Sequence, residues 1–293
     1  MFCRRGRVRI LITGANGILG QALRARLEQG NTLYLWGRDE ADLTDEAKTR
    51  AAAKGIEFEA VIHAAAYTNV DGAEREPDLA MAVNRDGTRH VAALASERNA
   101  AMVYVSTDYV FDGTKGAPYV ENDPTNPQSV YGKTKLAGET VALASGAAVL
   151  VARTSWLFGA GGKNFVDTIA DRLEKAAPLR VVNDQRGSPT YARDLAHGIE
   201  LLLRRGATGI VHVTNSGDTT WHGFAVEIAR YLGINAEIAE ISSVLLQQAA
   251  PRPRESILSG ARFRELTGES LPQWQDALHR YLAGRRARLG EVA

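Results

Sequence analysis

The stretch "RILITGANGILG", residues 9–20, joins an apolar run to the start of a helical pattern. Residues 9–13 are mostly apolar and β-branched, as in a strand that is buried on both faces. Gly14, Gly17 and Gly20 follow at three-residue spacing and lead into the helical pattern. Backbone amides at a helix N-terminus, with no side chains in the way, can hold a diphosphate. The stretch therefore predicts a strand–turn–helix unit that binds a dinucleotide.

The same alternation of apolar runs and helical patterns continues along the chain. Further strands are expected at residues 32–37, 59–66, 101–107 and 147–154, with helices over residues 81–99 and 132–145. Continuous apolar strands separated by helices are typical of a parallel sheet that is covered on both faces. The expected fold class is α/β, a Rossmann-type doubly wound parallel sheet with a smaller, interleaved C-terminal substrate lobe.

The alternation loosens after about Trp156. The later part predicts helices over residues 167–176, 194–206, 221–233 and 271–286, and strands at residues 178–184 and 209–216. We therefore expect residues 1–155 to form a dinucleotide-binding domain. Residues 156–293 are expected to form mainly a substrate-binding lobe, with some segments that return to the first domain.

Composition limits the classes of partner. The 293 residues carry a net charge of +1, which gives no electrostatic reason to expect a nucleic acid. No apolar run approaches the ~20 residues that a membrane span needs, so no membrane partner is expected. The one cysteine, Cys3, excludes an intramolecular disulfide and suits a reducing compartment. The apolar run after the basic start is too short for a signal peptide, so we expect a cytoplasmic protein.

The end of the second expected strand offers two ways to hold an adenosine ribose. An acidic residue roughly 20 positions after the glycines usually binds the ribose 2′-OH of NAD, and Asp39 is placed for this role. Arg38 beside it would instead pair with the 2′-phosphate of NADP. Both residues can also be ordinary loop charges. We favour NADPH, with NADH as the alternative.

A hydroxyl, a phenol and an ammonium follow the strand at residues 101–107. Thr107 ends this strand, at the sheet edge where open α/β sheets bind ligands. Tyr131 and Lys135 are four residues apart, so they lie on one face of the next helix. The hydroxyl would orient a carbonyl oxygen, the phenol would protonate it as hydride arrives at carbon, and the lysine would lower the pKa of the phenol. Together with the glycine turn, this combination predicts carbonyl reduction.

Seven motifs carry a resemblance to a known family over nearly the whole chain. They are "TGANGILG", "HAAAYTNVDGAE", "STDYVFDG", "SVYGKTKLAGE", "RTSWLFG", "DQRGSPT" and "TTWHGFA". The chain resembles the extended short-chain dehydrogenase/reductase superfamily and, within it, the dTDP-4-dehydrorhamnose reductase family. The order of "STDYVFDG", "YGKTKLAGE", "RTSW" and "DQRGSPT" is specific for this branch.

The resemblance implies a role for each residue that matches a family motif. The implied catalytic residues are Thr107, Tyr131 and Lys135. The implied cofactor contacts, with those inferred above, are Gly14, Gly17, Ile18, Leu19, Gly20, Arg38, Asp42, Leu43, Ala66, Tyr67, Thr68, Val105, Tyr131 and Lys135. The implied substrate contacts are Thr107, Asp108, Tyr131 and Trp156. No metal ligand is matched.

The resemblance implies an NADPH- or NADH-dependent reductase acting on C4 of a dTDP-linked 4-keto-6-deoxy sugar. It leaves open whether Mg²⁺ takes part and whether two copies form a homodimer. One alternative is a nucleotide-sugar epimerase or dehydratase of the same superfamily. Tyr109 follows Asp108 where a dehydratase would carry a second acid, which disfavours that alternative. Another is a non-catalytic regulatory subunit of methionine adenosyltransferase.

Several other residues have a structural interpretation beside a functional one. Ser106 is an alternative to Thr107, and Lys133 is expected to be a bystander on the helix. Trp221 and His63 are expected to be structural, the latter as a hydrogen-bonded core residue. The pair Arg252 and Arg254 has two readings of equal weight, a solvated loop pair or a clamp on the substrate diphosphate.

Overall fold

Six parallel strands form the large sheet of a computed structural model that describes residues 7–288 and 290. Their order across the sheet is β10-β5-β4-β3-β1-β2. The strands are β1 (Arg9–Thr13), β2 (Thr32–Trp36), β3 (Ala60–His63), β4 (Ala101–Thr107), β5 (Ala148–Thr154) and β10 (Gly209–His212). The doubly wound α/β fold is therefore confirmed. Cys3 lies outside the described residues.

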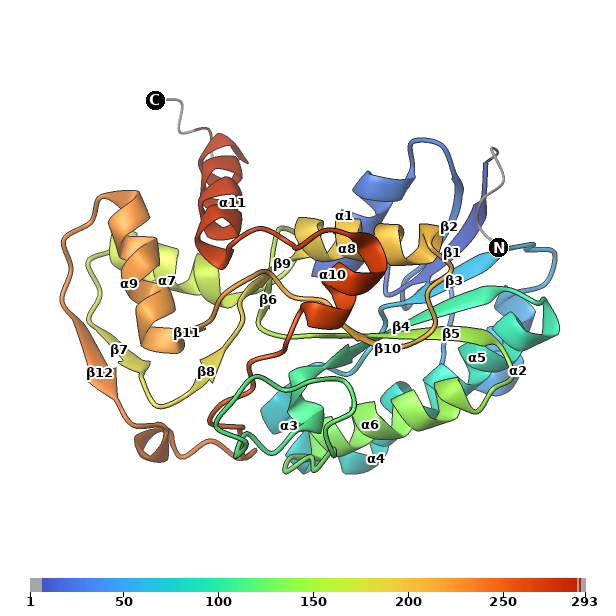
Figure 1. The fold of residues 1–293 in the computed structure, drawn as a ribbon, viewed down its shortest axis with the longest axis horizontal. Coiled ribbons are helices and arrows are strands. Elements are labelled where there is room, and N and C mark those ends of the chain that lie inside the picture. The colour runs from blue at the N-terminus through green and yellow to red at the C-terminus, as the bar shows by residue number, and fades with distance from the viewer. Residues whose placement is uncertain (1–6, 289, 291–293) are drawn as a thin grey trace.

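Helices cover both faces of this sheet (Figure 1). On one face lie α1 (Ile18–Leu27), α8 (Ala192–Arg204) and α10 (Ala261–Thr267). On the other lie α2 (Glu46–Ala52), α3 (Val70–Arg75), α4 (Pro77–Met81), α5 (Gly87–Glu97) and α6 (Val130–Leu143). Alternate residues of each strand point to opposite faces. Ile10 and Ile12 thus pack with α1 and α8, whereas Leu11 packs with α5.

The helix expected over residues 81–99 is interrupted. A π-helical turn, η1 (Ala82–Asp86), lies between α4 and α5. Apolar periodicity does not reveal such a turn, because the chain continues in the same direction with one wider hydrogen-bonded turn. The turn carries the buried Asn84.

The remainder of the chain forms a second apolar cluster at the far left of Figure 1, where α7, α9, β7 and β12 lie. Its elements are β6 (Leu157–Phe158), α7 (Phe165–Glu174), β7 (Leu179–Val182), β8 (Arg186–Gly187), β9 (Thr190–Tyr191), β11 (Thr219–Thr220), α9 (Trp221–Leu232), β12 (Ile238–Ile241), η3 (Ser243–Leu246) and α11 (Trp274–Arg288). The short strands pair as β6-β9, β7-β12 and β8-β11. Phe158, Phe224 and Tyr281 lie at the centre of this cluster.

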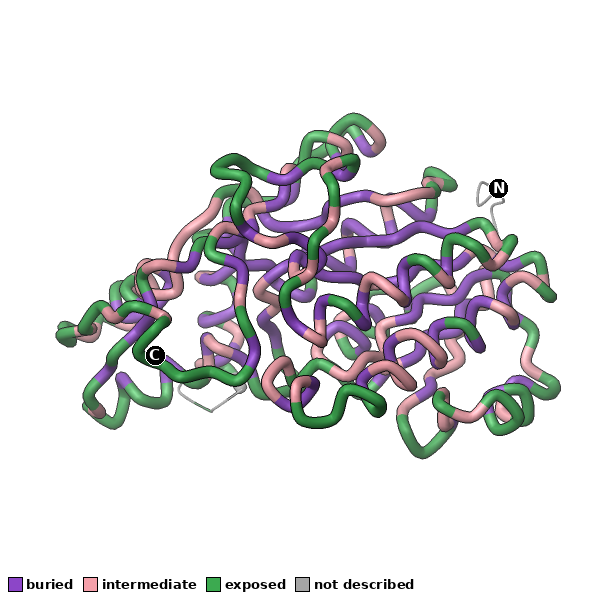
Figure 2. The backbone as a smooth tube through the Cα atoms, turned by 90° about the horizontal axis from the view of Figure 1, so that it is seen from below, coloured by how far each residue is buried: buried purple, intermediate pink, exposed green. Residues whose placement is uncertain are grey.

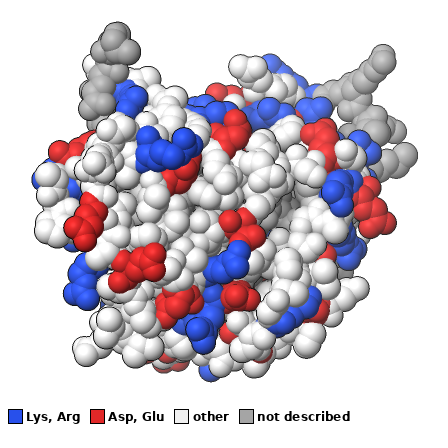
Figure 3. All heavy atoms as spheres, turned by 60° about the vertical axis from the view of Figure 1, so that its left-hand side comes forward, with Lys and Arg blue, Asp and Glu red and all other residues white. Residues whose placement is uncertain are grey.

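Burial and charge follow this arrangement. The central strands are buried, whereas the outer loops and outward helix faces are exposed (Figure 2). On the face shown in Figure 3, acidic and basic side chains are interspersed. No described helix is long and apolar enough to cross a membrane.

Candidate active site

The glycine turn is built for close backbone packing. Gly14 has φ +69°, and a Cβ on it would lie 2.6 Å from the backbone nitrogen of Ala65 after β3. A Cβ on Gly20 would lie 2.2 Å from the carbonyl oxygen of Gly14. Helix α1 begins at Ile18 after Gly17, and no side chain caps its first amides. These free N–H groups fit the diphosphate of a dinucleotide.

The predicted contacts Ile18 and Leu19 differ in what they offer. Leu19 is buried in the core between α1 and the sheet, so its side chain is not available to a ligand. Ile18 packs against a second glycine-rich loop, and a Cβ on Gly159 would lie 2.9 Å from its Cγ2. Gln21 ties the two loops together by donating to the carbonyl oxygens of Asn16 and Gly161 at 3.0 and 3.2 Å.

The turn after β2 leaves Arg38 and Asp39 exposed. Neither side chain has a hydrogen bond or ion pair within the part of the chain that the structure describes. Glu40, which the sequence analysis passed over, accepts from the Gly37 amide at 2.6 Å. Asp42 accepts from Thr44 and Lys48, and the Thr44 hydroxyl is the main cause of its lowered pKa. The turn therefore presents one free cation and one free carboxylate to a ribose.

Asn84 fixes the predicted cofactor segment at Ala66, Tyr67 and Thr68. Its Oδ1 accepts from the Tyr67 amide at 2.8 Å, and its Nδ2 donates to the Tyr67 carbonyl at 3.2 Å. The same Nδ2 donates to Thr134 of α6 at 2.9 Å. Asn84 thus joins the loop after β3 to the helix of Tyr131. In the sequence, the one sign of this role is that Asn84 is a polar side chain within an apolar helical pattern.

The N-terminus of α6 is held by two side chains. Ser129 Oγ accepts from the Gly132 amide at 3.1 Å, and Glu74 of α3 accepts from the Val130 amide at 2.8 Å. Tyr131 therefore sits in the fixed first turn, where the Tyr109 ring meets it edge-on at 5.5 Å. A capping serine was readable from the sequence, whereas Glu74 comes from a separate helix.

Tyr131 reaches the strand-end hydroxyl. Burial raises the pKa of Tyr131 to about 12, and a hydrogen bond with Thr107 opposes this rise. The expected lowering of this pKa by Lys135 does not occur in this arrangement. The reason is that Lys135 Nζ donates to the Val105 carbonyl at 2.7 Å and lies 4.1 Å from the Tyr104 ring centroid. Burial lowers the pKa of Lys135 to about 7.

Ser106 does not join Thr107. Its side chain points to the other face of the sheet and donates to Glu139 Oε1 at 2.5 Å. Glu139, one turn beyond Lys135 on α6, forms a bidentate pair with Arg153 of β5 at 2.8 and 2.7 Å. Both of these charged side chains are nearly inaccessible, at 3% and 2% exposed. Lys133 on the same helix is exposed, as expected of a bystander.

Asp108 lies buried beside Thr107. Thr107 Oγ1 donates to its Oδ1 at 3.0 Å, and Ser256 Oγ donates to its Oδ2 at 2.5 Å. Burial raises the pKa of Asp108 to about 6, although both hydroxyls lower it. Ser256 lies far along the sequence in the loop before α10 and carried no motif signal.

Trp156 and Trp221 form one aromatic unit. Their rings stack with centroids 3.5 Å apart at 6°. Trp156 has φ +46°, a strained conformation for a bulky residue. A Cβ on Gly187 would lie 2.5 Å from the Trp156 ring. Trp221 is therefore structural in packing but also covers the residue matched to the sugar.

The two arginines of the loop at residues 251–254 have different surroundings. Arg252 forms a bidentate pair with Asp71 of α3 at 3.1 and 2.7 Å, and its side chain is 14% exposed. It is therefore not a solvated loop charge. Arg254 is exposed, and its backbone carbonyl accepts from the Arg186 amide at 2.7 Å.

His63 is buried with both ring nitrogens bonded to Thr13 and Thr88, which confirms it as a core residue.

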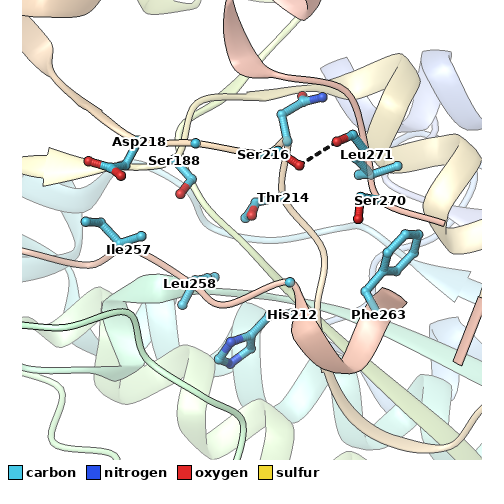
Figure 4. A pocket seen from close by; sticks show the side chains of 13 residues that line it. Ser188, His212, Thr214, Ser216, Asp218, Ile257, Leu258, Phe263, Ser270 and Leu271 are labelled. Atoms are coloured by element: carbon cyan, nitrogen blue, oxygen red, sulfur yellow. Dashed lines mark hydrogen bonds between the residues drawn. The ribbon is translucent and has the colours of Figure 1, made fainter. Parts of the chain in front are cut away.

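A pocket of about 140 Å³ lies at the carboxyl end of β10 (Figure 4). Ser188, His212, Thr214 and Leu271 are among its lining residues, and Ser216 Oγ donates to the Leu271 carbonyl. The lining includes no residue matched to catalysis, so we assign it no role in the chemistry. Among the described residues, no group of three His, Cys, Asp or Glu side chains could hold a metal ion.

Three comparisons agree with this arrangement. The chain matches the family model described as RmlD substrate binding domain over residues 8–286. It is 42% identical over 284 residues to the dTDP-4-dehydrorhamnose reductase of Streptomyces griseus, covering 93% of this chain and 92% of that protein. It is 38% identical over 275 residues to a Streptomyces antibioticus protein named probable dTDP-4,6-dihydroxy-2-methyloxan-3-one 4-ketoreductase, covering 92% of this chain and 93% of the relative.

A solved structure extends the match to three dimensions. The crystal structure of dTDP-4-dehydrorhamnose reductase from Bacillus anthracis in complex with NADP has a TM-score of 0.92 to this chain at 35% identity. It covers 95% of this chain and 99% of its own. The resemblance drawn from the motifs is confirmed. The chain therefore belongs to the dTDP-4-dehydrorhamnose reductase family and is an oxidoreductase of the dTDP-4-keto sugar reductase type.

Proposed function

We propose that this oxidoreductase converts dTDP-4-dehydro-L-rhamnose to dTDP-L-rhamnose by reducing the C4 keto group. The observation that carries the proposal is the contact between Thr107 and Tyr131 at the end of β4, with Lys135 one turn further along α6. The names of the Streptomyces griseus and Bacillus anthracis relatives support the substrate.

NADPH is the proposed cofactor, with NADH as the alternative. The uncapped amides of α1 would hold its diphosphate, and Asp42, Leu43 and the segment at residues 66–68 would line its adenosine side. The exposed Arg38 would pair with a 2′-phosphate. When bound, the cofactor supplies a hydride. The relative bound to NADP supports this choice.

Each residue of the cluster has one proposed task. Tyr131 donates its phenolic proton to the C4 oxygen, and Thr107 hydrogen-bonds the same oxygen. Lys135 holds the cofactor ribose with its buried ammonium. Asp108 and Trp156 position the sugar. Tyr109 packs against Tyr131 and helps to exclude water from it.

The two parts of the chain would divide the ligands. Residues 1–155, with β10 and α8 packed onto them, would bind the dinucleotide. The rest of residues 156–293 would bind the sugar nucleotide, with Arg254 free to meet its diphosphate. We place the enzyme in the cytoplasm, with a homodimer as one assembly to test by light scattering.

The test of the acid is Tyr131→Phe, which keeps the ring and removes the proton. We expect kcat for dTDP-4-dehydro-L-rhamnose to fall by ~10²–10⁴, with loss of NADPH followed at 340 nm. Tyr231→Phe, on α9, is the matched control and should retain wild-type turnover. Near-wild-type turnover by Tyr131→Phe would sink the proposal.

A second substrate is suggested by the Streptomyces antibioticus relative, whose name describes a different 4-keto sugar. The assay therefore uses a panel of nucleotide-linked 4-keto sugars with each cofactor. If another sugar of the panel gives the highest kcat/KM, the proposed reduction at C4 stands and the proposed substrate is replaced by that sugar.

The same assay separates the alternatives raised by the sequence. An epimerase or dehydratase would recycle a tightly held cofactor and consume none. A regulatory subunit would turn over no sugar and would instead co-purify with methionine adenosyltransferase. Stoichiometric loss of reduced cofactor excludes both.

A further inference from the structure

Asp108 is held from two distant parts of the chain. Thr107 Oγ1 donates to Asp108 Oδ1 at 3.0 Å, and Ser256 Oγ donates to Oδ2 at 2.5 Å across 148 positions of sequence. Asp108 is 2% exposed and Ser256 is 1% exposed. The carboxyl group therefore forms its side-chain hydrogen bonds with these two hydroxyls inside the protein.

The protonation state of Asp108 decides where the Thr107 hydroxyl points. A threonine hydroxyl has one hydrogen to donate and two lone pairs. When Asp108 is ionised, Thr107 must donate to it, and no hydrogen remains for Tyr131. When Asp108 is protonated, it can donate to Thr107 instead. Thr107 Oγ1 then accepts from Asp108 and from the Tyr109 amide at 3.2 Å. Its hydrogen is free to meet the C4 oxygen during reduction and the Tyr131 oxygen afterwards.

We propose that Asp108 and Ser256 are positioning residues that set the direction of the Thr107 hydroxyl and resupply the proton of Tyr131. The Tyr131 O–H bond breaks as its proton goes to the C4 oxygen. The Thr107 hydrogen then passes to the Tyr131 oxygen, and the Asp108 proton passes to Thr107. The carboxylate regains a proton that comes from water. This step rests on the proposed function of Tyr131 as the acid.

The surroundings of Asp108 suit this task. Burial brings its pKa to about 6, so that both protonation states exist near neutrality. The titratable groups that face it are Tyr131 on α6 and Tyr109 on its own turn. Beyond Tyr109 lies the Arg252–Asp71 pair, while Lys135 is directed to the Val105 carbonyl. Ser256 keeps one oxygen occupied, which leaves Oδ1 to carry the proton toward Thr107.

Ser256→Ala tests the proposal without touching the proposed substrate contacts. The serine hydrogen bond favours the ionised carboxylate, so its loss raises the pKa of Asp108. Because the protonated form is the active one, kcat falls as pH rises through this pKa. We expect this limb of the kcat profile to move up by about one pH unit, with KM values within about twofold. Ser259→Ala, in the same loop, is the control and should move nothing.

Asp108→Asn provides a second readout that does not depend on Ser256. An amide cannot lose a proton in this range, so the limb should disappear and kcat should fall by about 10–100-fold. The proposal is overturned if Asp108→Asn keeps the limb at the wild-type pH. It is also overturned if Ser256→Ala folds but lowers kcat equally at every pH. If Ser256→Ala does not fold, the Asp108→Asn profile decides.

These outcomes are distinct from failure of the proposed function. An active Tyr131→Phe variant would refute the role of Tyr131 as the acid, and the proton relay proposed for Asp108 would fail with it. An inactive Tyr131→Phe variant with unchanged profiles in the other two variants removes the relay alone.

Discussion

Lys135 is a cation buried beside a backbone carbonyl and an aromatic face, with no carboxylate within ion-pair distance among the described residues. Burial lowers its pKa from 10.5 to about 7 in the folded chain. The unfolded chain thus binds more protons between these two pH values, so Lys135 makes stability rise with pH across this window. Below about pH 7 both states are charged and the full cost of burial remains.

Lys135→Met should therefore be more stable than the wild type at pH 6. We expect a gain of ~3 kcal/mol that narrows as pH rises from about 7 to 10.5. Urea unfolding at several pH values measures it. Lys133→Met, on the exposed side of the same helix, should show no pH-dependent difference. A gap for Lys135→Met that stays constant with pH would contradict the argument.

At this scale the sequence predicted side-chain type and face but not partners. The four-residue spacing placed Tyr131 and Lys135 on one side of α6, yet the contact of Lys135 with Val105 depends on where β4 packs. Asn84 and Ser256 were missed for the same reason, because their partners come from other elements. The conflict between the Ser106 and Thr107 interpretations is resolved by strand alternation, which sends their side chains to opposite faces.

Between the elements, a buried ion pair joins α6 to β5. Glu139 and Arg153 are nearly inaccessible, Ser106 of β4 donates to the same carboxylate, and Arg153 Nη1 has no hydrogen-bond partner among the described residues. The pair therefore fixes α6, which carries the proposed acid Tyr131, against β4 and β5. Removing the charge of either side chain leaves the charge of the other buried without a partner.

Glu139→Gln should destabilise the fold by ~3–5 kcal/mol, as measured by the urea midpoint. The double variant with Arg153→Met should recover most of this loss, because no unpaired charge is then left between α6 and β5. Glu97→Gln, which breaks the exposed pair with Arg50, is the control and should stay close to wild type. A double variant no more stable than Glu139→Gln would mean that something other than the unpaired arginine causes the loss.

Most elements could be predicted because their apolar periods are long. The strand at residues 101–107 was predicted with the bounds of β4, since both faces of it are buried. The turn at η1 was not, because a π turn changes hydrogen bonding without changing which residues are apolar. Two-residue strands such as β6 and β8 are too short to carry a period.

Over the whole molecule, the loop that carries Ser256 is tied to the first half of the chain by Asp71. This carboxylate accepts from Arg252 and from the Ala250 amide. Arg252 lowers the pKa of Asp71 below its ordinary 3.8. The contact therefore contributes stability above about pH 4 and loses it as pH falls through the folded-state pKa.

Asp71→Asn should loosen this loop. We expect faster amide hydrogen exchange at Ala250 and Ser256 at pH 7 and a loss of about 1 kcal/mol in stability that shrinks as pH falls below the ordinary carboxyl pKa of 3.8. Asp78→Asn, on the exposed side of α4, is the control. Unchanged exchange at Ala250 would show that the loop is held by other contacts.

The return of β10 to the large sheet has a consequence for how the chain is made. β5 ends at Thr154, and its outer neighbour begins only at Gly209. During synthesis, the edge of β5 and the apolar side of α1 that α8 later covers stay open until the ribosome has passed both segments. Parallel strands that pair across such separations form slowly, and until they do their unpaired edges are prone to aggregation. Ser256 emerges later still. A chain that ends before Gly209 would therefore lack the outer strand of the sheet, whereas one that ends between His212 and Ser256 would have all six strands but lack the serine beside Asp108.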